Sequence, residues 1–125
     1  MKQLIQKLVE TPSPSGYEAQ IRSVVQAEIE PYTDALHVDA LGNLIAQKGQ
    51  GGADGIKIML AAHIDEIGVM VTHVDENGFV RFTTLGGVRP FTCVGGRVRF
   101  LNGATGVIYM EPLDDMTKVP AIDQL

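Results

Sequence analysis

The chain has 125 residues, of which 45% are hydrophobic and 20% are charged, and its formal net charge is −5. This composition is typical of a folded globular domain and argues against an intrinsically disordered chain. Acidic residues outnumber basic ones and no lysine- or arginine-rich run occurs, which argues against binding to nucleic acid. One cysteine cannot form an internal disulfide, and no apolar run is long enough for a signal sequence or a membrane span. We therefore expect a cytoplasmic protein with no membrane partner.

Two short helices are predicted at the amino terminus. Pro12 and Pro14 hold the segment after residue 10 in an extended conformation and separate the two helices. Ser15 followed by Glu18 is a capping-box pattern, which predicts the start of the second helix, and Pro31 ends it. The first helix is predicted from apolar residues at helical spacing, namely Leu4, Ile5, Leu8 and Val9. The apolar stripe of the second helix is Ile21, Val24, Val25 and Ile29.

Strands are predicted from residue 36 onward. Residues 36–38 and 44–46 flank a turn-forming segment and predict an antiparallel pair. The glycine-rich segment 49–55 lacks the lysine and hydroxyl residues of a phosphate-binding loop. Residues 56–62 form an almost continuous apolar run, which is typical of a central strand covered on both faces. A single central strand cannot build a sheet, so the chain is either an unusual small fold or the front part of a larger one.

The pattern changes to all-β after Gly68. Residues 69–74 and 79–82 predict one hairpin, and residues 97–101 and 105–109 predict another around Asn102-Gly103, which fits a type I′ turn. The fold class is therefore α/β, with an incomplete mixed sheet in residues 1–67, followed by part of an all-β, barrel-like domain in residues 68–125. The predicted barrel core comprises Val69, Val71, Phe82, Val98, Phe100 and Val107.

The predicted central strand leads directly into His63 and Asp65, at the strand end where open α/β sheets carry their ligands. In an extended segment these two residues share a face. A metal-bound imidazole needs an acceptor at its second nitrogen, and a nearby carboxylate meets that need. His63 is therefore the candidate metal ligand and Asp65 its orienting partner. The alternative is a strand-end histidine hydrogen-bonded to a neighbouring carboxylate, with no role in function.

The other reactive side chains have simpler interpretations. His37 and His73 lie on predicted strands without a second ligand at useful spacing. Cys93 is flanked by apolar residues and Thr92 and is predicted to be a buried thiol. The sequence contains no Gly-x-Ser-x-Gly nucleophile motif. Nothing in the sequence pairs any two of the carboxylates for glycosidase-like chemistry.

Three segments resemble the di-metal aminopeptidase family that contains tetrahedral, glutamyl and deblocking aminopeptidases. They are Thr11–Glu18, Asp39–Leu44 and, above all, Ala62–Met70, which contains His63-Ile-Asp65-Glu-Ile-Gly68. Later glycine-rich turns continue the match in order, so the resemblance covers nearly the whole chain. Such a match implies a metal-dependent aminopeptidase that removes N-terminal residues from peptides.

The resemblance also implies a fold and a set of functional groups. The family has a mixed α/β catalytic domain, with a small barrel-like domain inserted after the His-x-Asp motif. Its histidine ligand falls on His63, and the aspartate that supports this ligand, counted among the catalytic residues, falls on Asp65. The remaining ligands and the glutamate general base follow the insertion. Two divalent ions, zinc or cobalt, are implied, together with assembly into a homo-oligomer.

Three functions follow as hypotheses. The first is an aminopeptidase of this family, present here as its amino-terminal portion and inactive alone. The second is a non-catalytic β-rich association module derived from the family. The third, a related amidohydrolase or carboxypeptidase, is disfavoured by the run Asp65–Gly68 and the hairpin that follows it.

Overall fold

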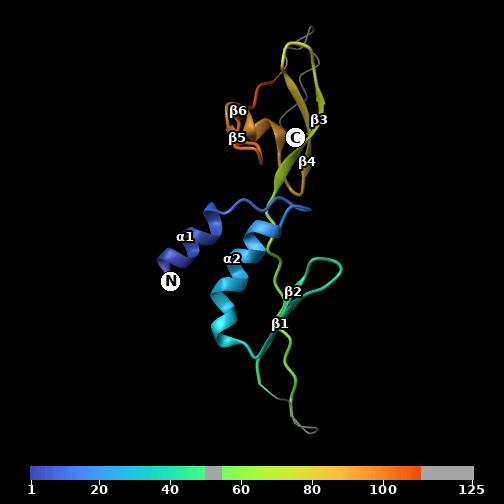
Figure 1. The fold of residues 1–125 in the computed structure, drawn as a ribbon. Helices are drawn as coiled ribbons and strands as arrows, with labels where there is room; N and C mark the ends of the chain where they lie inside the picture. Colours follow the sequence, from blue (N-terminus) through green and yellow to red (C-terminus); the bar gives the residue numbers. More distant parts are fainter. Residues whose placement is uncertain (50–54, 111–125) are drawn as a thin grey trace. The chain divides into compact units, whose positions relative to one another are not determined.

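The computed structural model describes residues 1–49 and 55–110 (Figure 1). It divides into two compact units, Met1–Gly86 and a second that begins at Gly87. This division describes the compact parts of these 125 residues and does not test where the domains of a larger fold would meet. The domain boundary expected between residues 67 and 68 therefore stays a prediction. Across the described ranges, no helix has both the length and the apolar character needed to cross a membrane.

The two predicted helices are present. Helix α1 spans Lys2–Glu10 and helix α2 spans Ala19–Ile29, followed by a 3-10 turn over Glu30–Tyr32 that contains Pro31. Lys7 Nζ lies 2.7 Å from Glu28 Oε1 and connects the two helices. Ile21 on α2 is only 4% exposed and is the one buried hydrophobic residue in the described part of the chain. The amphipathic pattern therefore predicted both helices, but of the two apolar stripes only Ile21 is buried, while Ile5 and Val9 are exposed and the others are half-buried.

The predicted capping box is wrong. Helix α2 begins after Glu18, and no side chain caps its first turn. The Glu18 carboxylate accepts the Gly16 N–H at 2.6 Å. Ser15 lies a full turn before Ala19, and its hydroxyl donates to Asp65. The pattern failed because it considers only local partners, whereas Ser15 has a partner fifty residues away in sequence.

The first predicted strand pair is confirmed. Strand β1 (Ala35–Val38) pairs antiparallel with β2 (Leu44–Gln47), and His37 lies opposite Ile45. Asp39 organises the turn between the strands: its Oδ1 accepts the backbone N–H groups of Leu41 and Asn43, each at 2.9 Å. Its other oxygen, Oδ2, accepts the Asn43 side-chain amide at 2.8 Å.

These contacts predict how the β1–β2 turn responds to acid. The pKa of Asp39 lies below the ordinary value of 3.8, chiefly because of the Asn43 side-chain amide and then the Asn43 backbone N–H. Since the contacts favour the carboxylate, their stabilisation is present at pH values above the unfolded pKa. It is lost as the pH falls through the lower, folded value. The NMR chemical shift of the Asn43 side-chain amide should follow the titration of Asp39, with a midpoint below 3.8. A midpoint at or above that value would contradict the assignment.

Gly42 closes the same turn with a φ of +89°. Its carbonyl accepts Arg22 Nη1 at 2.6 Å, and a Cβ at this position would lie 2.9 Å from the same nitrogen. Gly78 has a φ of +85° in the next hairpin, with nothing within 4 Å of such a Cβ. Both Gly42→Ala and Gly78→Ala should lose about 1 to 2 kcal/mol of stability, because alanine is strained at a positive φ. Gly42→Ala should lose more than Gly78→Ala, because only the Cβ at position 42 also disturbs Arg22.

Urea unfolding followed by circular dichroism measures this difference, and the matched background is Arg22→Ala. There, the two glycine substitutions should lose similar amounts of stability, because the disturbed contact is already gone. A difference that persists in the Arg22→Ala background would show that Arg22 is not its cause.

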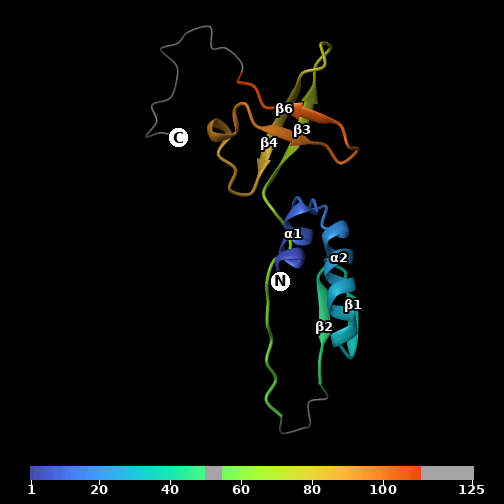
Figure 2. The same ribbon diagram turned by 90° about the vertical axis from the view of Figure 1, so that its left-hand side faces the viewer.

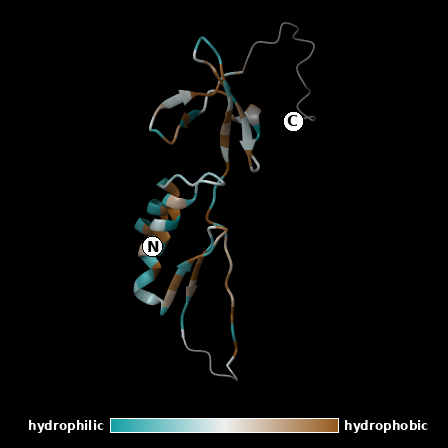
Figure 3. Cartoon of the chain, turned by 45° about the vertical axis from the view of Figure 1, so that its right-hand side comes forward, coloured by the Kyte–Doolittle hydropathy of each residue, from teal (hydrophilic) through white to brown (hydrophobic). Residues whose placement is uncertain are grey.

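The predicted central strand differs from expectation. Residues 56–62 follow an extended course without pairing to any strand in the described residues (Figure 2). Hydrophobic residues recur along this segment (Figure 3), and Ile56, Met59 and Leu60 are 91%, 88% and 93% exposed. The prediction of a buried strand is therefore wrong for this chain. An apolar strand is buried only if neighbouring strands and helices cover it, and the described residues provide none.

The first hairpin of the β-rich part is confirmed. Strand β3 (Gly68–Val74) pairs antiparallel with β4 (Val80–Leu85), and a register shift lies between Val71 and His73. Their connecting turn resembles that between β1 and β2: Asp75 Oδ1 accepts the N–H groups of Asn77 and Phe79 at 2.9 and 2.8 Å.

The second compact unit contains a 3-10 turn at Pro90–Cys93 and the strands β5 (Arg97–Arg99) and β6 (Thr105–Val107). The predicted hairpin is present, but its turn is not of type I′. Among the described residues only glycines have positive φ, and a type I′ turn would require it of Asn102 as well as Gly103. Instead, the loop has three residues, 101–103, between Phe100 and Ala104, and so is longer than a two-residue type I′ turn. Its last residue, Gly103, has a φ of +89° and donates its N–H to the Phe100 carbonyl at 2.9 Å.

The barrel is not present in the described residues, where β3–β4 and β5–β6 form separate two-stranded sheets. Of its predicted core, Val71 and Val107 are exposed, and the other members are half-buried.

Cys93 is half-buried where a buried thiol was predicted, and its Sγ lies 3.4 Å from the Arg89 carbonyl oxygen. Helices combined with small antiparallel sheets agree with the broad fold class, while the inserted barrel stays a prediction. Most of the glycine-rich segment 49–55 lies outside the described residues, and so do residues 121–125, whose sequence predicts the approach to another strand.

Candidate metal centre

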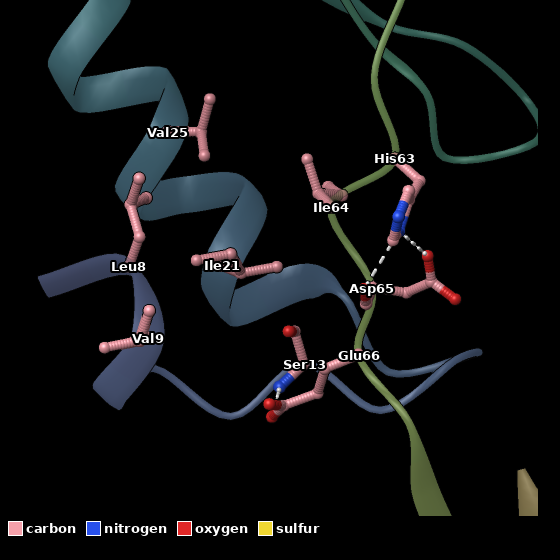
Figure 4. A pocket seen from close by; sticks show the side chains of 9 residues that line it. All are labelled: Leu8, Val9, Ser13, Ile21, Val25, His63, Ile64, Asp65 and Glu66. Carbon is pink, nitrogen blue, oxygen red and sulfur yellow. Dashed lines mark hydrogen bonds and ion pairs between the residues drawn. The ribbon is translucent and has the colours of Figure 1, made fainter. Parts of the chain in front are cut away.

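The His63–Glu66 segment is held against the proline-containing loop that joins the two helices. Pro14 and Glu66 form a parallel bridge, and the Glu66 N–H donates to the Ser13 carbonyl at 2.9 Å. The Glu66 side chain accepts the Ser13 N–H at 3.0 Å (Figure 4). Ser13 is only 4% exposed. Two segments far apart in the sequence are thus fixed side by side where the candidate site lies.

The two predicted site residues are in direct contact. His63 Nδ1 lies 2.9 Å from Asp65 Oδ1 and 3.1 Å from the Asp65 carbonyl oxygen (Figure 4). Both partners are acceptors, so Nδ1 carries the hydrogen in the neutral ring, and the lone pair lies on Nε2. The His63 side chain is 86% exposed, against 36% for Asp65. This arrangement presents a free imidazole nitrogen at an accessible position, as a metal ligand requires.

Asp65 is also held by a residue that the sequence did not identify as part of the site. The Ser15 hydroxyl donates to Asp65 Oδ2 at 2.5 Å. This hydrogen bond, followed by the one with His63, holds the pKa of Asp65 below its usual value. Ser15 lies within the first of the three family-like segments, which was the only sequence signal that it could contribute to the site.

A pocket of about 310 Å³ adjoins this cluster (Figure 4). One wall is polar and includes His63 and Asp65, with Ser13 and Glu66 below them. The other side is lined by apolar residues from the helices and from the segment itself, namely Leu8, Val9, Ile21, Val25 and Ile64. The pocket therefore combines an apolar surface with a group able to bind a cation.

The other histidines do not contribute to this cluster. His37 lies on β1 opposite Ile45, and His73 lies on β3 opposite Arg81. Within residues 1–49 and 55–110, no group of three or more histidine, cysteine or acidic side chains could hold a metal ion. His63 thus fits as one ligand of a metal centre, and the described residues do not complete the ligand set.

Comparison with solved structures indicates the class of protein. The chain matches an aminopeptidase from the archaeon Desulfurococcus kamchatkensis with a TM-score of 0.80 and 36% identity, covering 95% of this chain and 34% of that one. It also matches the TET1 peptidase of Pyrococcus horikoshii with a TM-score of 0.76 and 32% identity, covering 97% and 37% of the two chains. The first of these proteins is described as an aminopeptidase, and the second as a peptidase that can assemble into a tetrahedron or a large octahedral shell.

The sequence comparison identifies the family. A model of the M42 glutamyl aminopeptidases matches residues 42–121, which is more than half of the chain. The chain belongs to the M42 glutamyl aminopeptidase family, as the sequence motifs predicted. A protein of Acetivibrio thermocellus, provisionally named an aminopeptidase, is 48% identical over 118 residues, which cover 93% of this chain and 34% of that protein. The chain spans about a third of the length of the curated relatives it matches.

Proposed function

We propose that this chain forms the amino-terminal third of a metal-dependent aminopeptidase, which removes N-terminal residues from peptides, and that the chain is inactive alone. One observation carries the proposal: Asp65 holds the Nδ1 side of the His63 ring, which leaves Nε2 free to bind a metal ion. Membership of the M42 family supports peptide hydrolysis as the reaction. The span of about a third of the relatives' length supports the partial role.

The cofactors in this proposal are two divalent ions, zinc or cobalt, which suit a ligand set of histidine and carboxylates. Bound ions would act as Lewis acids and activate water for attack on the peptide carbonyl. Within this chain, His63 would bind one ion through Nε2. Asp65 would keep the ring in the required tautomer and increase the basicity of the free nitrogen. The remaining ligands and a glutamate general base would come from outside residues 1–125.

The proposed partners are peptide substrates and further copies of the same subunit. Self-assembly is supported by the Pyrococcus horikoshii peptidase, which is described as forming a tetrahedron or an octahedral shell. The net charge of −5 supports the absence of nucleic-acid partners. A cytoplasmic location and the absence of a membrane partner complete the proposal.

A non-catalytic association module is the second candidate function. Its supporting observation is that Val107 on β6 is 66% exposed and Met70 on β3 is 50% exposed. Apolar side chains on small sheets of this kind can associate with another subunit. In this function the chain would bind copies of itself or a related subunit and would need no metal.

Sequencing the gene beyond Leu125 and assaying its complete product distinguishes the two functions. For an aminopeptidase, the reading frame should continue through further acidic and histidine residues. Its product should then hydrolyse aminoacyl-p-nitroanilides when zinc or cobalt is added and lose that activity with a chelator. A stop codon directly after Leu125, together with a metal-independent oligomer, would favour the association module.

A further inference from the structure

We propose that Ser15 is a positioning residue of the candidate metal centre: its hydroxyl fixes the Asp65 carboxylate, which in turn orients the His63 ring. This inference rests on the proposed function, because it assigns Ser15 a role toward the metal that His63 would bind. It concerns residues of this chain only, and its main test needs neither metal nor turnover.

Few contacts hold the His63 side chain. Its side chain is 86% exposed, so packing does not fix the ring. Within the described residues, its hydrogen-bond partners are the carboxylate and the carbonyl oxygen of Asp65. The direction of Nε2 therefore depends on Asp65, whose carboxylate is the nearer of the two partners, at 2.9 Å against 3.1 Å for the carbonyl oxygen.

The Asp65 carboxylate is fixed through both of its oxygens. Oδ1 faces His63 Nδ1 at 2.9 Å, and Oδ2 accepts the Ser15 hydroxyl at 2.5 Å. Rotation of the carboxylate about its terminal torsion is soft in general, because that torsion is broad. Partners at both oxygens oppose that rotation, since turning the group toward one partner breaks the contact with the other. Without the Ser15 hydroxyl, the carboxylate would keep only the exposed His63 ring and the backbone N–H of Asp65 itself as partners, and Oδ2 would lose the contact that sets its direction.

The loop that carries Ser15 fixes the position of its backbone. Pro14 limits the backbone on one side, and its carbonyl accepts the Tyr17 N–H at 2.8 Å in a tight turn. The parallel bridge and the paired bonds between Ser13 and Glu66 dock the loop two residues before Ser15. A Cβ at Gly68 would lie 3.0 Å from the Pro14 Cβ, so the loop and the later segment approach closely.

The failed capping box supports the same conclusion. A serine three residues before a glutamate would normally cap the helix, and here its hydroxyl is directed to Asp65 instead. Local rules are broken most often where a residue serves a site. Loop docking does not require the Ser15 side chain, because Ser13 and Glu66 already provide it through backbone and carboxylate contacts.

The test measures the tautomer of His63 in the metal-free, isotope-labelled 125-residue chain. Long-range proton–nitrogen NMR at pH 8 identifies which ring nitrogen carries the hydrogen. The wild-type chain should hold the Nδ1–H form. Ser15→Ala should shift the ring toward the Nε2–H form that free imidazole side chains prefer in water, and Ser15→Thr, which keeps a hydroxyl, should restore the wild-type form.

Ser13→Ala is the matched control, since it keeps the backbone groups that hold Glu66 and should leave the tautomer unchanged. The proposal is overturned if the wild-type chain shows the Nε2–H form or if Ser15→Ala keeps the Nδ1–H form. It is also overturned if Ser15→Thr fails as Ser15→Ala does, because a hydroxyl at position 15 would then not set the tautomer. The same shift in Ser13→Ala would overturn it too, because that result would indicate a general loss of structure.

A second readout is zinc affinity in the complete protein, where Ser15→Ala should weaken binding by about 10-fold, at the low end of the range for residues behind a ligand. The two proposals fail separately. An inactive complete protein with the expected tautomer changes would refute the aminopeptidase function alone. An active protein in which Ser15→Ala leaves tautomer and zinc affinity unchanged would refute the role of Ser15 alone.

Discussion

The purified 125-residue chain is expected to release no p-nitroaniline from aminoacyl-p-nitroanilides above the uncatalysed rate, with or without added zinc or cobalt. A di-metal centre needs several ligands that converge in space and a base within reach of the attacking water. The described residues provide His63 and its partner Asp65, and no group of three metal-binding side chains. Relative to an intact enzyme, the loss should be of the order of 10⁶-fold or more, the usual span of enzymatic rate enhancement.

A chimera provides the control for this prediction. In it, the chain replaces the matching third of the Acetivibrio thermocellus relative, to which it is 48% identical. Turnover that a chelator abolishes should return in the chimera and disappear again with His63→Ala. The prediction would be wrong if the 125-residue chain alone gave chelator-sensitive turnover that His63→Ala removes, because this pattern excludes a contaminating enzyme.

Zinc binding by the complete protein should decrease in a fixed order when the site is altered. Asp65→Asn should weaken zinc affinity by about 10- to 100-fold, because it alters the group behind the ligand. His63→Ala should weaken it further, because it removes the donor atom itself. Titration calorimetry measures both effects.

The control for zinc binding is His37→Ala. His37 is exposed on β1 and has no metal-binding partner among the described residues, so its replacement should leave zinc affinity unchanged. Unchanged affinity in both His63→Ala and Asp65→Asn would overturn the metal assignment.

The sequence predicted those features that depend on neighbouring residues. Helices α1 and α2 follow from apolar side chains at helical spacing, and Pro31 ends the second as expected. The three hairpins follow from alternation between turn-forming segments. The turn at Asn102-Gly103 was predicted in place but not in type, because the pattern cannot distinguish one positive φ from two.

In the candidate metal centre, too, the sequence predicted the contact between near neighbours and missed the contact between distant residues. His63 and Asp65 are two residues apart, so an extended backbone alone places them on one face, and their contact was expected. Ser15 was missed because its contact joins residues fifty positions apart, and a local pattern offered it another role. The buried strand at residues 56–62 was predicted wrongly for a related reason: burial depends on what covers a strand, and an apolar run does not contain that information.

The exposed segment at residues 56–62 also has a consequence for contact between separate copies of the chain. Its peptide groups lack sheet partners within the described residues, and Ile58 is 81% exposed beside them. An extended apolar segment with open hydrogen-bonding groups is a template on which an identical segment can assemble edge to edge. The backbone groups that would be paired in a completed sheet are thus the same groups through which isolated copies would aggregate. Lys57 is the single charged residue in this segment. Edge-to-edge assembly would bring the Lys57 side chains of neighbouring copies close together, and their repulsion would oppose it.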